Sequence, residues 1–269
     1  MLGAAEIRQL AESLDLRPTK KLGQNFVIDP NTIRKIVSQA NLRSDDLVLE
    51  IGPGLGSLTL GLFEVVDQVV AVEVDSRLAE LLPETISRFA PTKRLTVVHA
   101  DAMKVRELPS EPTALVANLP YNISVPVLLH FLENFPSIER VLVMVQAEVA
   151  HRLAAGPGSK DYGSPSVKLA WYGHAKLAGS IGRNVFWPAP QVDSALVYFE
   201  RQRTGSDPEL FKLIDAAFGM RRKTLRQALA GWAGSAQNAE AILKKAGVNP
   251  SARGEQLAVD DFVRVASSR

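Results

Sequence analysis

The 269-residue sequence contains no cysteine, and this absence removes several kinds of chemistry. Without thiols the chain can form no disulfide, no thiolate zinc site and no iron–sulfur cluster. Attack by a cysteine nucleophile is excluded for the same reason. The four histidines, His99, His130, His151 and His174, show no metal-ligand spacing. We therefore expect no metal site.

Long apolar runs are also lacking. No run approaches the ~18 residues that a membrane span requires. The first residues lack the basic start and the apolar core of a signal peptide. The apolar fraction of 46% is that of an ordinary globular protein, which excludes the disordered and fibrous classes. We expect a cytoplasmic, monomeric protein that does not enter a membrane.

Strand-like and helix-like segments alternate along the first 200 residues. Apolar runs typical of buried strands lie at 47–51, 69–74, 95–100, 114–117, 141–145 and 195–199. Helical patterns lie at 4–14, from Asp29-Pro30 onward, and at 57–63, 77–89, 125–135 and 147–153. This alternation is typical of α/β proteins with a doubly wound, mostly parallel, Rossmann-like sheet. We expect the last strand to be antiparallel, at one edge.

The pattern changes at Thr204-Gly205-Ser206-Asp207-Pro208, which predicts a linker in which Asp207 caps the next helix. Beyond it the pattern is helical only, at 209–218, 223–232, 236–246 and 255–266. We therefore predict a sheet domain over residues 1–203 and a small all-helical domain over residues 204–269.

Positive charge is concentrated in the predicted helical domain. From Arg201 onward there are twelve Lys or Arg against seven Asp or Glu, a net charge of +5. The whole chain has a net charge of +2, so the first 200 residues have about −3. A basic appendage is typical of a protein with an anionic partner, although a solvated helical surface would look similar. The residues that we predict to contact phosphate groups are Lys20, Lys21, Arg221, Arg222, Lys223 and Arg226.

A glycine-rich turn, Gly52-Pro53-Gly54-Leu55-Gly56, follows the first predicted parallel strand. Such glycines let a ligand approach the backbone closely, and Glu73, twenty-one residues after Gly52, can accept bonds from ribose hydroxyls. Both a nicotinamide dinucleotide and S-adenosylmethionine fit. The dinucleotide fingerprint requires glycine where Ser57 stands, so the spacing favours the methyl donor. Asp101, at the end of the third strand, can accept from the adenine amine of that donor and can also cap a turn.

The segment Asn118-Leu119-Pro120-Tyr121 follows a buried strand pattern, and open α/β sheets bind ligands where strands end. The exocyclic amine of a base is a poor nucleophile until acceptors hold its N–H groups. Asn118 offers a side-chain oxygen, and Leu119 offers a carbonyl whose direction the following proline restricts. Tyr121 offers a ring for stacking. A simple strand-to-turn junction would place Asn and Pro here too.

Taken together, the motifs resemble the family of small-subunit (16S-type) ribosomal RNA adenine N6,N6-dimethyltransferases over almost the whole chain. The resemblance rests on segments 21–26, 50–56, 72–75, 100–102, 118–121, 184–190 and 221–225. One departure is Val27, where the family more often has Leu. The resemblance implies methylation of two neighbouring adenines in the hairpin near the 3′ end of the small-subunit RNA, within a partly assembled subunit.

The resemblance also assigns residues. It implies that S-adenosylmethionine is bound by Asn25, Val27, Gly52, Gly54, Glu73, Asp101 and Asn118. The target amine would be held by Asn118, with the adenine between Tyr121 and Phe186. Leu119 and Pro120, from the same motif, complete the predicted catalytic set. Without the resemblance, Phe186 would be taken for an aromatic residue of the core.

Three other functions compete. The first is a macrolide-resistance adenine methyltransferase that acts on large-subunit RNA. The second is a non-catalytic rRNA-binding assembly factor on the same scaffold, and the third is a dinucleotide oxidoreductase. The loop at 184–190 and the helical tail favour the small-subunit family over the large-subunit methyltransferases. The intact segment 118–121 favours a catalytic protein over an assembly factor without activity. Ser57, in place of a glycine, disfavours the oxidoreductase.

Overall fold

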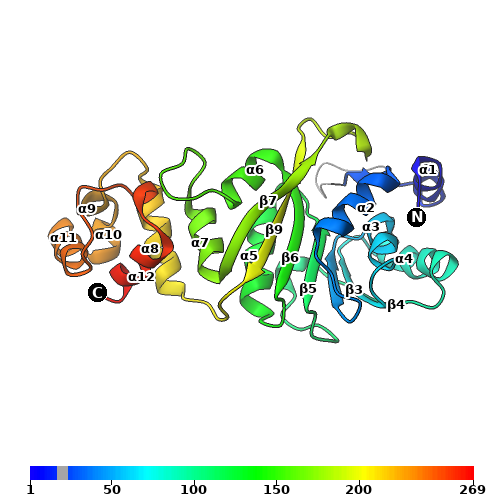
Figure 1. The fold of residues 1–269 in the computed structure, drawn as a ribbon, viewed down its shortest axis with the longest axis horizontal. Coiled ribbons are helices and arrows are strands. Elements are labelled where there is room, and N and C mark those ends of the chain that lie inside the picture. The colour runs from blue at the N-terminus through cyan, green and yellow to red at the C-terminus, as the bar shows by residue number, and fades with distance from the viewer. Residues whose placement is uncertain (17–23) are drawn as a thin grey trace. The chain divides into compact units, whose positions relative to one another are not determined.

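We analysed a computed structural model, in which residues 1–16 and 24–269 are described. The chain divides into two compact units (Figure 1). The first, the sheet unit, consists of residues 1–150 and 176–202, and the second, the helical unit, consists of residues 151–175 and 203–269. No helix of the described residues is both long enough and apolar enough to span a bilayer.

The described part of the sheet unit is built on a seven-stranded sheet with the order β4-β3-β2-β5-β6-β9-β7. Strands β2 to β6 pair in parallel, and β9 pairs antiparallel to β6. The bounds are β2 Leu47–Ile51, β3 Gln68–Glu73, β4 Arg94–His99, β5 Ala114–Asn118, β6 Arg140–Gln146, β7 Gly173–Ile181 and β9 Ser194–Arg201. The predicted α/β architecture, mostly parallel with one antiparallel strand, is confirmed, but β7 and not β9 lies at the edge.

Three strands were not predicted. Along β7 only the two end residues are buried, and Gly179 interrupts the strand at φ +134°, so no apolar alternation marks it. The other two, β1 (Phe26–Val27) and β8 (Phe186–Trp187), have two residues each and pair antiparallel with each other. Strands this short leave no periodic pattern in a sequence. Their pairing sets Val27 opposite Phe186.

Helices cover the sheet (Figure 1). Their bounds are α1 Ala4–Ser13, α2 Pro30–Gln39, α3 Ser57–Leu62, α4 Ser76–Phe89, α5 Ser124–Asn134 and α6 Ala147–Leu153. Val48, Val69 and Val116 share one core cluster with residues of α2, α3 and α4. The next residues along two of these strands, Leu49 and Ala117, are buried as well. Because neighbouring strand residues point to opposite faces, both faces of the sheet are covered.

Local signals explain where α2 begins. Asp29 accepts hydrogen bonds from the backbone N–H groups of Asn31 and Thr32, and Pro30 occupies the first helical position, where its missing N–H costs nothing. This start was predicted from the sequence. Because the helix begins here, separated from β1 by only two residues, its apolar residues, among them Ile33 and Val37, join the core cluster of the sheet unit.

The helical unit has its own core, which includes Leu213, Leu225 and Phe262. Its elements are α7 Ser164–Tyr172, α8 Pro208–Gly219, α9 Leu225–Ala228, α10 Ala230–Ala233, α11 Ala236–Lys245 and α12 Val259–Ala266. The side chain of Asp207 caps α8, as predicted, by accepting from the backbone N–H of Leu210. The helix predicted at 223–232 is divided into α9 and α10, and α12 begins four residues later than predicted.

Residues 151–175, which we predicted to lie in the first domain, group with the helical unit. Tyr162 and Val167 are buried in the core of that unit. The Tyr162 hydroxyl donates to the backbone carbonyl of Leu257 over 2.8 Å. Contacts between residues this far apart in the chain leave no local signal, which is why this grouping could not be read from the sequence.

Candidate active site

A cavity of about 360 Å³ opens at the carboxyl ends of the parallel strands. This is the edge where doubly wound sheets bind ligands. All seven residues predicted to bind the donor line it, namely Asn25, Val27, Gly52, Gly54, Glu73, Asp101 and Asn118. The structure therefore brings together residues from segments that are up to 93 positions apart in the chain.

The glycine turn forms one wall. Gly52, Gly54 and Gly56 all have positive φ, at +69°, +58° and +91°, a region that other residues rarely adopt. A Cβ atom on Gly54 would lie 2.8 Å from Cε1 of Phe26, so β1 can pack on the turn only because this residue is glycine. The turn thus serves two purposes, exposing backbone to the cavity and admitting the N-terminal segment.

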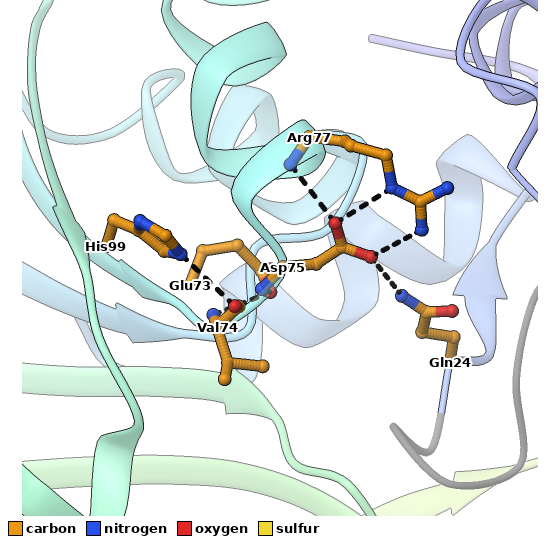
Figure 2. A network of polar contacts seen from close by, with 6 residues as sticks. All are labelled: Gln24, Glu73, Val74, Asp75, Arg77 and His99. Atoms are coloured by element: carbon orange, nitrogen blue, oxygen red, sulfur yellow. Dashed lines mark hydrogen bonds and ion pairs between the residues drawn. The ribbon is translucent and has the colours of Figure 1, made fainter.

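Glu73, at the end of β3, is 5% exposed. Its carboxylate accepts three backbone N–H groups, from Gly54 at 3.1 Å, Val74 at 2.8 Å and Asp75 at 2.9 Å. Burial raises the pKa of Glu73 and outweighs these donors, which lower it. The bonds fix the direction of the carboxylate beside the cavity. Figure 2 shows Glu73 next to Val74 and Asp75 at this strand end.

Asp75 ties the N-terminal segment to the same strand end (Figure 2). Its carboxylate accepts from Nε and Nη2 of Arg77, at 3.2 and 2.9 Å, and from Nε2 of Gln24 at 3.3 Å. The hydrogen bond from Arg77 is the main reason why the pKa of Asp75 is lowered. Gln24 also lines the cavity, and the bond to Asp75 holds it there. We did not predict this role of Gln24.

Asp101 combines the two roles that the sequence left open to it. Its side chain accepts from the backbone N–H of Met103 at 3.0 Å and caps the 3-10 turn Ala102–Lys104. It also lines the cavity, and 43% of its side chain remains exposed. Oδ1 holds the turn, while Oδ2, which lies 4.0 Å from Nζ of the exposed Lys104, is the oxygen that can accept from a ligand.

Asn118 lies at the end of β5 and lines the cavity. Its Nδ2 donates to the backbone carbonyl of Asn25 at 3.0 Å, which leaves the acceptor Oδ1 as the other end of the amide. The N–H of Leu119 donates to the carbonyl of Met144 at 3.1 Å, and Pro120 also lines the cavity. Leu119 itself is buried and, unlike Asn118 and Pro120, is not among the residues that line the cavity.

Tyr121 and Phe186 do not line the cavity. The Tyr121 hydroxyl lies 2.7 Å from Oγ of the buried Ser194, and burial raises the pKa of Tyr121. Phe186 is 3% exposed and belongs to the core cluster of the sheet unit. Stacking of an adenine on the Phe186 ring therefore requires the loop around β8 to move.

The predicted phosphate contacts differ in their surroundings. Lys20 and Lys21 lie outside the described residues. Arg221 pairs with Glu255 at 3.3 Å and donates to the carbonyl of Lys160, and Arg226 pairs with Glu240 at 2.8 Å. Arg222 and Lys223 are exposed and form no ion pair with the described part of the chain.

Three further polar residues line the cavity without a predicted role, Glu50, Ser57 and Asn122. Glu50 is the last polar residue of β2 before the glycine turn, and it is 1% exposed. A charged residue inside an otherwise apolar strand was the signal that could have revealed it, because buried carboxyl groups without a function are rare.

Residues 16–268 match the family described as ribosomal RNA adenine dimethylase. The "Ribosomal RNA small subunit methyltransferase A" of Streptomyces coelicolor is 62% identical over 100% of this chain and 97% of its own length. The protein of the same name from Streptomyces avermitilis is also 62% identical, over 100% of this chain and 94% of its own.

Solved structures of a ribosomal RNA methyltransferase and a dimethyladenosine transferase have a similar fold. A dimethyladenosine transferase from Plasmodium falciparum superimposes with a TM-score of 0.75 over 88% of this chain and 94% of its own, at 24% identity, which shows the shared fold. The 23S rRNA methyltransferase ErmE has a TM-score of 0.66 and 28% identity over 91% and 99%. The enzyme class that the motifs predicted, an adenine dimethyltransferase acting on ribosomal RNA, is confirmed. By sequence over nearly its whole length and by fold, the chain belongs to the ribosomal RNA adenine dimethylase family.

Proposed function

We propose that this protein transfers methyl groups from S-adenosylmethionine to the N6 amines of two adjacent adenines in the 3′-terminal hairpin of 16S ribosomal RNA. It acts in the cytoplasm as a monomer, on a pre-assembled small subunit, and so takes part in ribosome biogenesis. The observation that supports this most is the convergence of the seven predicted donor-binding residues, Asn118 among them, on one cavity.

The cavity suits S-adenosylmethionine, which is a cation with an adenosine and a methionine portion. Glu73 and Asp101 offer carboxylates at the ends of β3 and β4, suited to ribose hydroxyls and to an adenine amine. Three carboxyl groups line the cavity, and none of the described lining residues is Lys, Arg or His. An acid-lined cavity without basic residues favours a cationic ligand over a dinucleotide with its anionic pyrophosphate.

When bound, the donor supplies an electrophilic methyl group on sulfur. The chain supplies acceptors for the amine, which are Oδ1 of Asn118 and the carbonyl of Leu119. These oxygens place negative potential where the nitrogen becomes positive, so no strong base is required. Most of the rate enhancement then comes from alignment, which contributes up to ~7–11 kcal/mol in near-ideal geometry. The bond from Asn118 Nδ2 to Asn25 fixes which end of the amide faces the base.

The target adenine is held by stacking. Tyr121 presents a half-buried ring next to the amine acceptors, and its hydroxyl is anchored on Ser194. Phe186 joins it once the β8 loop opens, and stacking on one aromatic ring contributes about 1–3 kcal/mol per base. In the helical unit, Arg222 and Lys223 are the basic residues best placed to contact RNA phosphates, because no described acid neutralises them.

The test compares two RNA substrates. Immature small subunits and large-subunit RNA are each incubated with the protein and labelled donor, and primer extension then maps the modified positions. We expect label only in the small subunit, at two neighbouring adenines near the 3′ end, and none with Asn118→Ala. Label confined to large-subunit RNA would instead favour a large-subunit adenine methyltransferase, the candidate function that the likeness to the 23S rRNA methyltransferase structure supports.

A further inference from the structure

His130 is a buried histidine that the proposed function does not use. It lies on α5 and is 7% exposed. Its Nε2 lies 2.7 Å from the backbone carbonyl of Val105, the residue that follows the 3-10 turn Ala102–Lys104. Asp101, just before this turn, and the first two residues of the turn line the donor cavity. The hydrogen bond of His130 therefore joins α5 to the segment that forms one wall of the cavity.

The groups around the imidazole assign a role to each ring nitrogen. A carbonyl oxygen can only accept, so Nε2 carries the hydrogen that is donated to Val105. Nη1 of Arg106 lies 2.8 Å from both ring nitrogens, and it donates to Nδ1 because only Nδ1 has a free lone pair. Nδ2 of Asn134, at 3.4 Å, is a weaker second donor to Nδ1. Both ring nitrogens therefore have partners in the segment 105–106.

Side chains hold the 3-10 turn at both of its ends. At the start, Oδ1 of Asp101 accepts from the backbone N–H of Met103 at 3.0 Å. At the end, His130 holds the carbonyl of Val105, and Nη1 of Arg106 lies 3.4 Å from the carbonyls of Met103 and Val105. Because a three-residue 3-10 turn has few and poorly aligned hydrogen bonds of its own, its position depends on these side chains.

We propose that His130 is a positioning residue for the methyl donor, because it holds the turn that directs Oδ2 of Asp101 toward the adenine amine. This inference rests on the proposed donor and on the proposed contact between Asp101 and its adenine. The side chain of Asp101 is 43% exposed, so burial does not fix its direction, whereas the turn that it caps does. His130 acts on the ligand only through this turn, since it does not line the cavity itself.

Calorimetry with S-adenosylhomocysteine and S-inosylhomocysteine tests the proposal. The two ligands differ only in the base, because hypoxanthine has a carbonyl oxygen in place of the amine and cannot donate to Asp101 from that position. We expect wild type to prefer the adenine ligand about ten- to a hundredfold, as a hydrogen bond to a charged group contributes. This ratio of affinities reports the direction of Asp101, and a general loss of stability does not change it.

Three substitutions and a control vary the contacts of the imidazole. His130→Leu keeps the apolar bulk and removes both ring nitrogens, and we expect the ratio to fall to about threefold or less. His130→Gln can still donate to Val105 and accept from Arg106, so its ratio should stay within about twofold of wild type. Arg106→Met, at an exposed position, should lower the ratio about two- to threefold. Glu133→Gln, an exposed change on α5, is the matched control and should leave the ratio unchanged.

Thermal unfolding of each variant checks that it is folded, and Arg106→Met remains the test if His130→Leu is not. A wild-type ratio in both of these variants would overturn the proposal even if they unfold at lower temperature, because His130 would then serve the core alone. An equal loss in His130→Gln and His130→Leu would overturn it too. Wild type without a preference for adenine would contradict the role of Asp101, and wild type that binds neither ligand would contradict the proposed donor. Either result would remove the basis of this inference as well.

Discussion

The two units differ in how their candidate functional residues are held. In the sheet unit, the predicted donor-binding residues come from several strand ends and a glycine turn, and all line one cavity. In the helical unit, the predicted phosphate contacts are neighbours in the sequence but differ in their charged partners. Acids elsewhere in the chain pair with Arg221 and Arg226 and leave the basic residues between them unpaired within the described structure. Strand register determines where a side chain at a strand end lies, whereas a cluster of charges on helices depends on partners that the local sequence does not show.

The largest effect should come from Glu73. Glu73→Ala removes a carboxylate that lines the cavity and also accepts three backbone N–H groups of the turn and the strand end. We expect donor affinity by calorimetry to fall at least about a hundredfold, because charge-assisted bonds to ribose and the positions of Gly54 and Val74 are lost together. Glu73→Gln, which keeps one acceptor, should lose less. Equal affinity in wild type and Glu73→Ala would contradict the assignment of the donor site.

A second effect concerns stability and pH. The folded-state pKa of Glu50, about 8, lies above its ordinary value of 4.5, so the unfolded chain loses this proton at lower pH than the folded chain does. The stability that Glu50 contributes is therefore present below pH 4.5 and is lost as the pH rises to about 8. Glu50→Gln has no such loss. Its advantage over wild type in urea unfolding should grow between pH 5 and pH 8, to a few kcal/mol.

The exposed variant Glu80→Gln serves as the reference for that series, since its difference from wild type should stay flat with pH. An advantage of Glu50→Gln that is the same at pH 5 and pH 8 would mean that Glu50 does not titrate in this window.

Features that depend on local signals could be predicted from the sequence, whereas features that depend on contacts between distant residues could not. The parallel strands and the start of α2 were predictable because apolar runs, Asp29 and Pro30 are local signals with local consequences. The pairing of β1 with β8 was not, because two-residue strands that meet across 160 positions leave no pattern. The positions of Glu73 and Asn118 followed from counting to a strand end. The role of Gln24 could not be predicted, because it depends on Asp75, far along the chain.

Substitution of Tyr121 should distinguish binding of the donor from methylation of the base. Tyr121→Ala should leave donor affinity within about twofold, since the ring does not line the cavity. Turnover should fall about 10- to 100-fold, as expected from losing one stacking surface. Tyr121→Phe keeps the ring and loses only the bond to Ser194, so it should retain most of the activity. A loss of donor affinity equal to the loss of turnover would show that Tyr121 shapes the donor cavity instead.

The smallest effect should come from the helical unit. Each phosphate contact contributes about 0.9 to the slope of log affinity against log salt, so replacing Arg222 and Lys223 together by alanine should reduce that slope by nearly two. Donor affinity and stability should not change, because both side chains are exposed.

The matched pair is Arg221→Ala with Arg226→Ala. These arginines already hold Glu255 and Glu240, so their loss should lower stability slightly and change the salt slope less. If the two double variants reduce the slope equally, the ion pairs give way to RNA. The predicted phosphate contacts at 221–226 would then act together on RNA, as their closeness in the sequence indicates.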